Sequence, residues 1–357
     1  MSLLPSFNAN AIQVTDNNVD DYNPEVSNYG DIVWEHEFGA NDTDLYYNSY
    51  LDEDRIVAQD TINEGYADIS PLGHVAFEQE YAYNDQDIAY YDYFTDTTTV
   101  VANTTNNEYN PQLTNNHIVY EYEYSGGDLD IRLYDINSNT TIDIANDTNY
   151  EYNPQIAGNY VTYESEFGLG DNDIYRYDIS TGETIAIATA TNNETNAQVS
   201  YSGHVVYEFE YAHGDIDINF YDNITGQTTT LASSTHDEIN PDIAGNYVTW
   251  EAWDGHDWEV YRYSQYDGQT VQITDNDVDD YNAQVSDQGY VVWEHQYSAH
   301  DTDVYLYTGG STGTIELGNS TYDEVNPQIA ADQVTWQAWD GHDWEVYSAE
   351  VGVDAYL

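Results

Sequence analysis

Hydrophobic and polar residues alternate along short segments of this chain, and the segments come in sets of four. One such set consists of residues 196–200, 203–211, 215–221 and 228–232. Polar turns rich in Gly, Asn and Asp separate the segments. Alternation with a period of two between such turns is typical of half-buried β-strands. No apolar spacing of 3.6 residues is sustained anywhere, so the sequence predicts an all-β fold.

An aromatic residue followed by an acid, or by Gln in the last unit, marks the second segment of every set. The pairs are Trp34-Glu35, Phe77-Glu78, Tyr120-Glu121, Tyr163-Glu164, Tyr207-Glu208, Trp250-Glu251, Trp293-Glu294 and Trp336-Gln337. Successive aromatics are 43 or 44 residues apart. Four short strands repeated at this interval are typical of β-propeller blades, which bury their apolar faces only against neighbouring blades. The sequence therefore predicts an eight-bladed β-propeller.

The last unit lacks a fourth strand at its own end. Its third strand is predicted at 344–349, and the tail 350–357 does not match the fourth-strand pattern. Residues 13–23 nearly duplicate residues 272–282, so 11–15 form a fourth strand without its own blade. We expect this strand to pair with the last unit and close the ring, which removes two open sheet edges. Closing a neighbouring molecule is the alternative. The chain then divides into an N-terminal arm, residues 1–10, and a single propeller, residues 11–357.

Short motifs recur in register with the repeat. An Asn-Pro pair opens the first strand of five units, at Asn23-Pro24, Asn110-Pro111, Asn153-Pro154, Asn240-Pro241 and Asn326-Pro327. Val-Thr-Trp occurs in second strands at 248–250 and 334–336, Trp-Glu-Val-Tyr in third strands at 258–261 and 344–347, and Thr-Gly in turns at 181–182 and 225–226. In these motifs the chain resembles TolB-type β-propeller repeats, in particular the tandem surface-protein repeats of archaea and bacteria. The resemblance implies a propeller that serves in binding or scaffolding, and it assigns no catalytic residue. The chain departs from it by having eight units and far more acid.

The charge balance is extreme. The chain has 67 Asp and Glu against four Lys and Arg, all of them Arg, for a net charge of −63. Such a chain repels nucleic acid and anionic membranes, which bind basic surfaces. It also repels itself in the compact state unless a counter-charge is present. Two interpretations remain open, namely solubilising acidity as in salt-adapted proteins, and divalent cations that complete the fold.

Other features of the composition bear on location. The chain has no cysteine, which excludes disulfides and thiolate metal sites. No run of 18 apolar residues predicts a membrane span, and residues 1–10 lack the basic region of a secretory signal. Asn-x-Ser/Thr sequons at Asn139, Asn146 and Asn223 and the absence of Lys favour an external location. We therefore expect an extracellular or cell-surface protein, exported without a cleaved N-terminal signal.

Acidic residues repeat at three positions of the blade. The first position, two residues before the Asn-Pro start, holds Asp21, Glu64, Glu108, Glu151, Glu194, Glu238, Asp280 and Glu324. The second, after the second-strand aromatic, holds Glu35, Glu78, Glu121, Glu164, Glu208, Glu251 and Glu294. The third is a pair that enters strand three: Asp42/Asp44, Asp85/Asp87, Asp128/Asp130, Asp171/Asp173, Asp215/Asp217, Asp257/Glu259, Asp301/Asp303 and Asp343/Glu345.

The topology of a four-stranded meander gathers these acids. The loop that enters strand one and the loop between strands two and three emerge at the same rim of a propeller. Two carboxylates about 5 Å apart repel by about 3 kcal/mol at an effective dielectric constant of about 20. Because the chain has almost no Lys or Arg, we expect the counter-charge to be Ca²⁺, which prefers six to eight oxygen ligands. All acids at the three positions are candidate ligands, with one or more ions per blade.

A simpler interpretation stands beside this one. An acid at a turn often accepts backbone N–H bonds and fixes the loop without a metal. His36, His256, His295 and His342 do not occupy a fixed blade position, so we interpret them as loop residues rather than zinc ligands. Three of the arginines, Arg132, Arg176 and Arg262, occupy similar third-strand positions, which indicates blade packing.

These features favour a non-enzymatic, Ca²⁺-stabilised propeller that acts as a structural, adhesive or self-assembling module. Its partners would be a surface glycan or protein, or a second copy bound through the N-terminal arm. A lectin-like glycan-binding propeller is a close alternative. A polysaccharide-active enzyme, a lyase or a glycosidase, is the other, since paired acids serve in glycoside cleavage. Acids that recur in every blade count against an active site, which breaks the symmetry.

Overall fold

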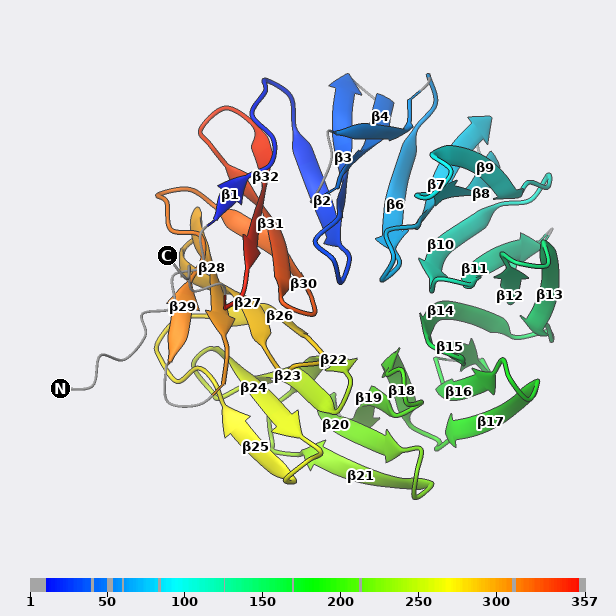
Figure 1. Cartoon of the computed structure of the whole chain (residues 1–357). Helices are drawn as coiled ribbons and strands as arrows, with labels where there is room; N and C mark the ends of the chain where they lie inside the picture. The colour runs from blue at the N-terminus through cyan, green and yellow to red at the C-terminus, as the bar shows by residue number, and fades with distance from the viewer. Residues whose placement is uncertain are drawn as a thin grey trace.

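The structure is a computed structural model that describes residues 11–39, 42–49, 54–59, 61–82, 85–124, 126–168, 170–211, 214–309 and 313–352. Eight four-stranded antiparallel sheets surround one axis, as Figure 1 shows, so the predicted eight-bladed propeller is confirmed. Within the described ranges, no helix is long and apolar enough to cross a membrane. The N-terminal arm, residues 1–10, lies outside the described residues.

The strands of each blade run outward from the axis in chain order. The innermost strands are β2 (Asp21–Val26), β6 (Glu64–Ile69), β10 (Glu108–Leu113), β14 (Tyr150–Ala157), β18 (Asn193–Val199), β22 (Glu238–Ala244), β26 (Asp280–Val285) and β30 (Glu324–Ala330). The second strands are β3 (Ile32–Gly39), β7 (Val75–Ala82), β11 (His117–Tyr124), β15 (Tyr160–Glu166), β19 (Val205–Tyr211), β23 (Tyr247–Trp253), β27 (Val291–Ser298) and β31 (Gln333–Trp339).

The two outer strands complete each blade. The third strands are β4 (Asp42–Asn48), β8 (Asp85–Asp92), β12 (Asp128–Asp135), β16 (Asn172–Asp178), β20 (Asp215–Asp222), β24 (Trp258–Ser264), β28 (Asp301–Tyr307) and β32 (Trp344–Glu350). The outermost strands are β5 (Arg55–Ala58), β9 (Thr97–Ala102), β13 (Thr140–Ala145), β17 (Glu183–Ala188), β21 (Gln227–Ala232), β25 (Gln269–Gln272), β29 (Thr314–Glu316) and β1 (Ile12–Gln13).

The N-terminal strand closes the ring of its own molecule, as expected. β1 pairs antiparallel with β32, with Ile12 opposite Ser348 and Gln13 opposite Tyr347 (Figure 1). The last blade is therefore built from both ends of the chain, in the order β30, β31, β32 and β1. The predicted segment 11–15 is shorter as a strand, because only Ile12 and Gln13 form ladder pairs.

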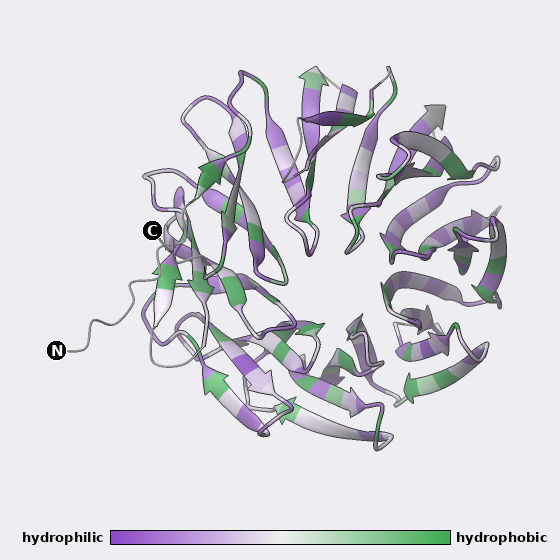
Figure 2. Ribbon diagram, viewed as in Figure 1, coloured by the Kyte–Doolittle hydropathy of each residue, from purple (hydrophilic) through white to green (hydrophobic). Residues whose placement is uncertain are grey.

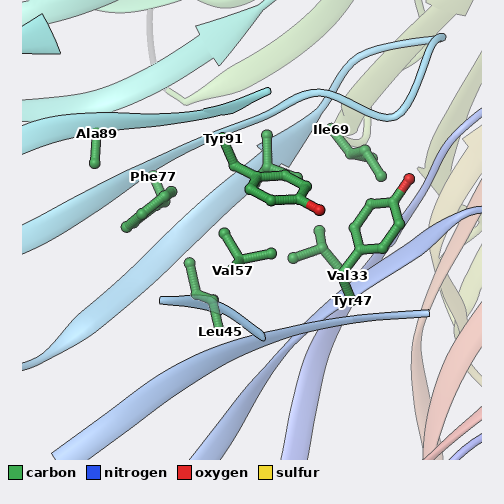
Figure 3. Close-up of a cluster of buried hydrophobic side chains, with 9 residues drawn as sticks. Val33, Leu45, Tyr47, Val57, Ile69, Phe77, Ala89 and Tyr91 are labelled. Atoms are coloured by element: carbon green, nitrogen blue, oxygen red, sulfur yellow. The ribbon is translucent and has the colours of Figure 1, made fainter. Parts of the chain in front are cut away.

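The hydrophobic core lies between the blades. Each of the eight buried apolar clusters among the described residues combines side chains from two neighbouring blades. Figure 3 shows one of them, in which Leu45 and Tyr47 of blade 1 face Phe77 and Tyr91 of blade 2. Figure 2 shows the matching alternation of hydrophobic and hydrophilic residues along the strands. No blade buries its apolar face alone, which is why the sequence repeats as it does.

Each innermost strand carries a bulge at one residue in the left-handed region. Seven of these residues are Asn, and Asn110 has a φ of 50°. Asn tolerates this conformation better than most residues, which explains its repetition. Blade 2 differs, because Tyr66 takes this position with a φ of 50°.

Two residues after the bulge, a polar ring surrounds the axis. Its members are Glu25, Asp68, Gln112, Gln155, Gln198, Asp242, Gln284 and Gln328. A cavity of 260 Å³ between β18, β22 and β26 is lined by Gln198, Asp242 and Gln284. The Asp68 carboxylate accepts a hydrogen bond from the Leu113 amide at 2.6 Å, and Asp242 accepts one from Val285 at 2.8 Å. The ring therefore joins neighbouring blades near the axis.

Stability should depend on pH through this ring. Burial raises the pKa of Asp68 to about 7, and burial followed by repulsion from Asp68 raises the pKa of Glu25 well above its usual value. A raised carboxyl pKa means that the folded state holds the proton, so stability is lost as pH rises from about 4 to about 7. Asp68→Asn should be neutral at pH 4 and stabilise by about 2–4 kcal/mol at pH 8. Denaturant unfolding at the two pH values measures this, and a less stable variant at pH 8 would contradict it.

Candidate metal centres between the blades

The acids of the second position form hydrogen bonds between neighbouring blades. Each carboxylate accepts a bond from a backbone N–H at or next to the bulge of the next innermost strand. The Asn153 amide donates to Glu121 at 2.7 Å, and the Asn240 amide donates to Glu208 at 2.8 Å. In the blade 6 to blade 7 contact the donor is Ala283, which lies 3.4 Å from Glu251. These bonds hold consecutive blades in register.

The bulge side chain binds the second-position acid of its own blade. The Asn153 side chain donates to Glu164 at 2.7 Å, and the Asn282 side chain donates to Glu294 at 2.7 Å. In the eighth blade, Gln337 replaces the acid and accepts the Asn23 amide at 2.8 Å. Because a neutral carboxamide performs the same role, this position needs an acceptor and not a charge. The structure thus gives these acids a role that requires no metal.

A substitution at one of these acids tests that role. Glu121→Gln should keep the free energy of unfolding within about 0.5 kcal/mol of the native protein, because Gln337 already fills the equivalent position. Glu121→Ala should lower it by about 1–3 kcal/mol, since it leaves the buried Asn153 amide without its acceptor. Denaturant unfolding measures both. Loss of a bound cation in Glu121→Gln would instead make Glu121 a ligand.

The other two acidic positions meet across each blade junction, not within one blade. The pair from strand three of one blade lies beside the first-position acid of the next. The sets are Asp42/Asp44 with Glu64, Asp85/Asp87 with Glu108, Asp128/Asp130 with Glu151, Asp171/Asp173 with Glu194, Asp215/Asp217 with Glu238, Asp257/Glu259 with Asp280, Asp301/Asp303 with Glu324, and Asp343/Glu345 with Asp21. At six of the eight junctions the carboxylates raise one another's pKa, with the sets at Asp44 and Asp130 as exceptions.

Side-chain lengths within these sets are complementary. Where strand three supplies Asp-x-Asp, the next blade supplies Glu; where it supplies Asp-x-Glu, the next blade supplies Asp. The eight sets follow this rule without exception. A gain of one methylene on one side is offset by a loss on the other, as expected if the three side chains share a space of fixed size. This pattern was visible in the sequence and indicates the junction sets directly.

Many of the junction carboxylates are buried with an oxygen that has no hydrogen-bond partner in the protein. Residues with such an oxygen are Asp42, Asp85, Asp87, Glu108, Asp130, Asp171, Glu194, Asp215, Asp217, Asp257, Glu259, Asp303, Asp343 and Glu345. Burial and then the Asp147 carboxylate raise the pKa of Glu151 to about 8. Burial and then Glu324 raise the pKa of Asp303 to about 7. A buried carboxylate without a partner is costly, so these oxygens call for protons or cations.

Two junctions bring three carboxylates together. Oxygens of Asp254, Asp257 and Glu259 lie within 4.8 Å of one another, and so do those of the equivalent Asp340, Asp343 and Glu345. Elsewhere in the described part of the chain no such triad forms. Asp257 is 3% exposed and Glu259 0%, and both Asp257 oxygens lack a partner. Ca²⁺ binds oxygens at about 2.4 Å, so oxygens on its opposite sides lie about 4.8 Å apart, and each triad can contact one ion.

The first-position acids beside these triads are already satisfied. Asp280 accepts bonds from the Trp293 ring at 2.8 Å, the His295 ring at 2.6 Å and the Asn276 side chain at 2.5 Å. Asp21 has the equivalent partners Trp34, His36 and Asn17. The two histidines therefore serve an acid and not a metal, in agreement with their interpretation as structural residues. At these junctions the third ligand comes instead from the loop between strands two and three.

Asp254 and Asp340 are triad members that the analysis of repeated positions missed. They lie in the motif Ala-Trp-Asp-Gly-His-Asp-Trp-Glu-Val-Tyr, which only blades 6 and 8 contain. The Asp254 carboxylate also accepts the His256 and Asp257 amides at 2.7 and 3.2 Å, and these bonds lower its pKa. The loop is thereby folded so that Asp254 reaches the buried pair. The shared motif, and not the eight-fold repeat, was the signal for these sites.

The arginines lie in the blades rather than at the axis. Each guanidinium stacks on a tyrosine ring: Arg55 on Tyr93, Arg132 on Tyr122, Arg176 on Tyr160 and Arg262 on Tyr247. Arg176 and Arg262 also donate to the carbonyls of Gly203 and Gly289 in the next blade. This agrees with the packing role indicated by their third-strand positions. The four cations do not gather into a site for an anionic ligand.

Comparisons with known proteins identify the fold alone. No family model matches the chain, and no curated protein matches it in sequence. A prolyl endopeptidase structure is similar with a TM-score of 0.66 and 11% identity, over 90% of this chain and 55% of that one. This chain thus spans just over half of that enzyme. An oligogalacturonate lyase in complex with manganese is similar with a TM-score of 0.60 and 11% identity, over 97% of this chain and 98% of that one.

The resemblance to TolB-type repeats is supported only at the level of a β-propeller. TolB from Acinetobacter baumannii has 17% identity and a TM-score of 0.46, over 68% of this chain and 63% of that one. A likeness of this extent carries no argument about the family. The repeat family therefore stays a prediction, whereas the propeller itself is established by the strand order.

Proposed function

We propose that this protein is a non-catalytic β-propeller whose blade junctions bind Ca²⁺, and that it serves as a structural or adhesive module outside the cell. The observation that carries the proposal is the buried, unpartnered carboxylate oxygen that recurs at the junctions. The two triads are the strongest sites, because three carboxylates converge there within reach of one ion. The remaining junctions offer fewer converging oxygens and would bind more weakly.

The donor set favours Ca²⁺ over other metals. Carboxylate oxygens are hard ligands, and neither triad contains a histidine or a cysteine, the ligands that zinc prefers. Three carboxylates and flexible loop geometry suit Ca²⁺ better than Mg²⁺, which demands near-ideal octahedral geometry and retains its water. Because extracellular Ca²⁺ is abundant, the dependence fits a protein outside the cell. The absence of Lys is consistent with that location.

Titration of chelator-treated protein with Ca²⁺ tests the proposal. Calorimetry should detect at least two ions per chain, and Asp257→Asn and Asp343→Asn should each remove one of them. The double variant should remove both of the tightest sites. Glu208→Gln, which changes an acid at the inter-blade bonds, is the matched control and should bind as many ions as the native protein. No heat of binding above that of a buffer blank would remove the proposal.

A polysaccharide-active enzyme is the second candidate. It is favoured by one finding, the fold likeness to an oligogalacturonate lyase over nearly the whole length of both chains. The four arginines count against an anionic substrate, since all of them stack within blades. Incubation with uronate polymers and neutral glycans, with product detection by chromatography, separates the candidates. We expect no cleavage, and robust turnover would replace the non-catalytic proposal.

A further inference from the structure

The closure of the ring depends on a short strand. β1 forms two residue pairs with β32, and both Ile12 and Gln13 are exposed. The equivalent strand of blade 6, β25, forms four pairs with β24. The main-chain ladder that holds the two ends of the chain together is thus about half as long as its counterpart. Other contacts must contribute to closure.

Those contacts gather at the blade 8 triad. The Asn17 amide donates to one Glu345 oxygen at 2.9 Å, the Val346 amide donates to the Thr15 hydroxyl at 2.8 Å, and the Trp344 amide donates to Asp20 at 3.0 Å. The second Glu345 oxygen is buried without a partner and belongs to the triad with Asp340 and Asp343. A single carboxylate is therefore shared between the closure contact and the candidate metal site.

Blade 6 provides the same arrangement in a continuous stretch of chain. The Asn276 amide donates to Glu259 at 2.7 Å, the Val260 amide donates to Thr274 at 2.8 Å, and Trp258 donates to Asp279 at 3.1 Å. Asn276 and Glu259 are 17 residues apart, whereas Asn17 and Glu345 are 328 apart. The two sites are thus matched in their contacts and differ in what they connect.

We propose that a divalent cation held by Asp340, Asp343 and Glu345 is the latch that keeps the ring closed. This inference rests on the proposed function and adds a role for one of its sites. Without the ion, three carboxylates within 4.8 Å repel one another and displace Glu345 from the Asn17 amide. With the ion, Glu345 is fixed and holds the N-terminal segment, residues 11–20, against β32. A hollow of 280 Å³ lined by Asp20, Glu37 and Asp343, among others, gives an ion access from solvent.

The consequence of ion loss differs between the two sites because of chain connectivity. In blade 6, the strand β25 remains tethered to β24 by a short turn, so opening frees only a small loop and gains little entropy. In blade 8, opening frees the whole end of the chain from β32 and leaves that strand as an unpaired edge. The ion in blade 8 therefore controls closure of the ring, and the ion in blade 6 stabilises one loop.

Hydrogen exchange of the full chain, followed by mass spectrometry, tests the latch. In Ca²⁺, Asp343→Asn should lower the protection of residues 11–20 about tenfold or more and leave 269–276 unchanged. The matched variant Asp257→Asn should loosen 269–276 and leave 11–20 unchanged. Neither Asp343 oxygen has a hydrogen-bond partner, so the substitution breaks no direct contact with the N-terminal segment. Native protein in chelator, which needs no substitution, should lose protection in both segments.

The outcomes separate the latch from the proposed function. If native protein binds Ca²⁺ and Asp343→Asn loses one ion, but residues 11–20 stay as protected as in the native protein, the latch is wrong and the proposed function stands. Equal exposure of residues 11–20 in Asp257→Asn also overturns the latch, because general loosening then explains the result. If native protein binds no Ca²⁺, both fail together.

Discussion

Removal of Ca²⁺ should lower the melting temperature of this protein by about 10 °C or more at pH 8 and low ionic strength. A ligand at 100 times its Kd stabilises the folded state by about 2.7 kcal/mol per site, so two triads contribute about 5 kcal/mol. Each kcal/mol shifts the melting temperature of a domain this large by about 2 °C. Differential scanning calorimetry with and without a chelator measures the shift.

The control for this experiment is monovalent salt. A solubilising or salt-adapted acidic surface responds to ionic strength, since NaCl screens exposed charges as well as CaCl₂ of equal ionic strength does. Bound Ca²⁺ between buried carboxylates is not replaced by Na⁺ at the same ionic strength. Full recovery in CaCl₂ and little recovery in NaCl supports the junction sites. Equal recovery in both salts would favour the general acidity interpretation that the composition left open.

Asp217→Asn should change stability in opposite directions with and without Ca²⁺. Asp217 is 2% exposed, has an unpartnered oxygen and has its pKa raised by burial and then by Asp215. In chelator the substitution removes repulsion and should stabilise the protein by about 2–3 kcal/mol. In Ca²⁺ it removes a ligand, so the variant should be less stable than the native protein. Thermal unfolding of both proteins in the two conditions measures the reversal.

Glu208→Gln is the matched control in the same junction. Glu208 accepts the Asn240 amide at 2.8 Å and the Asn196 side chain at 3.0 Å, and a carboxamide can accept the first of these. Its effect should therefore have the same size and sign with and without Ca²⁺. An acid that only fixes a loop behaves like Glu208. If Asp217→Asn lowered stability equally in both conditions, Asp217 would be such an acid and not a ligand.

The architecture could be predicted from sequence because it depends on periodic features. The 43-residue interval places the eight second-strand aromatics, and the structure buries each of them between blades, as with Trp250 at 1% exposure. Ring closure was equally legible, since residues 13–23 duplicate 272–282. Repetition of this kind carries fold information because every blade must present the same faces to its neighbours.

The grouping of the acids was less legible. Sequence analysis placed all three acidic positions of a blade at one rim, but the structure separates Glu121 from Asp128 and joins it to the Asn153 amide of the next blade. Alternation gives the face of a strand and says nothing of which neighbouring blade supplies the partner. The replacement by Gln337 was a sign that charge is not required there. Asp254 and Asp340 escaped because they depart from the repeat, and departures are where specific sites arise.

The most direct test is a crystal grown in Ca²⁺, with anomalous diffraction measured at a long X-ray wavelength. The account predicts anomalous density between Asp254, Asp257 and Glu259, and equally between Asp340, Asp343 and Glu345, with oxygen ligands at about 2.4 Å. Weaker density at the remaining junctions would agree with it. Carboxylates turned toward bulk water, with no anomalous density between them at saturating Ca²⁺, would contradict it.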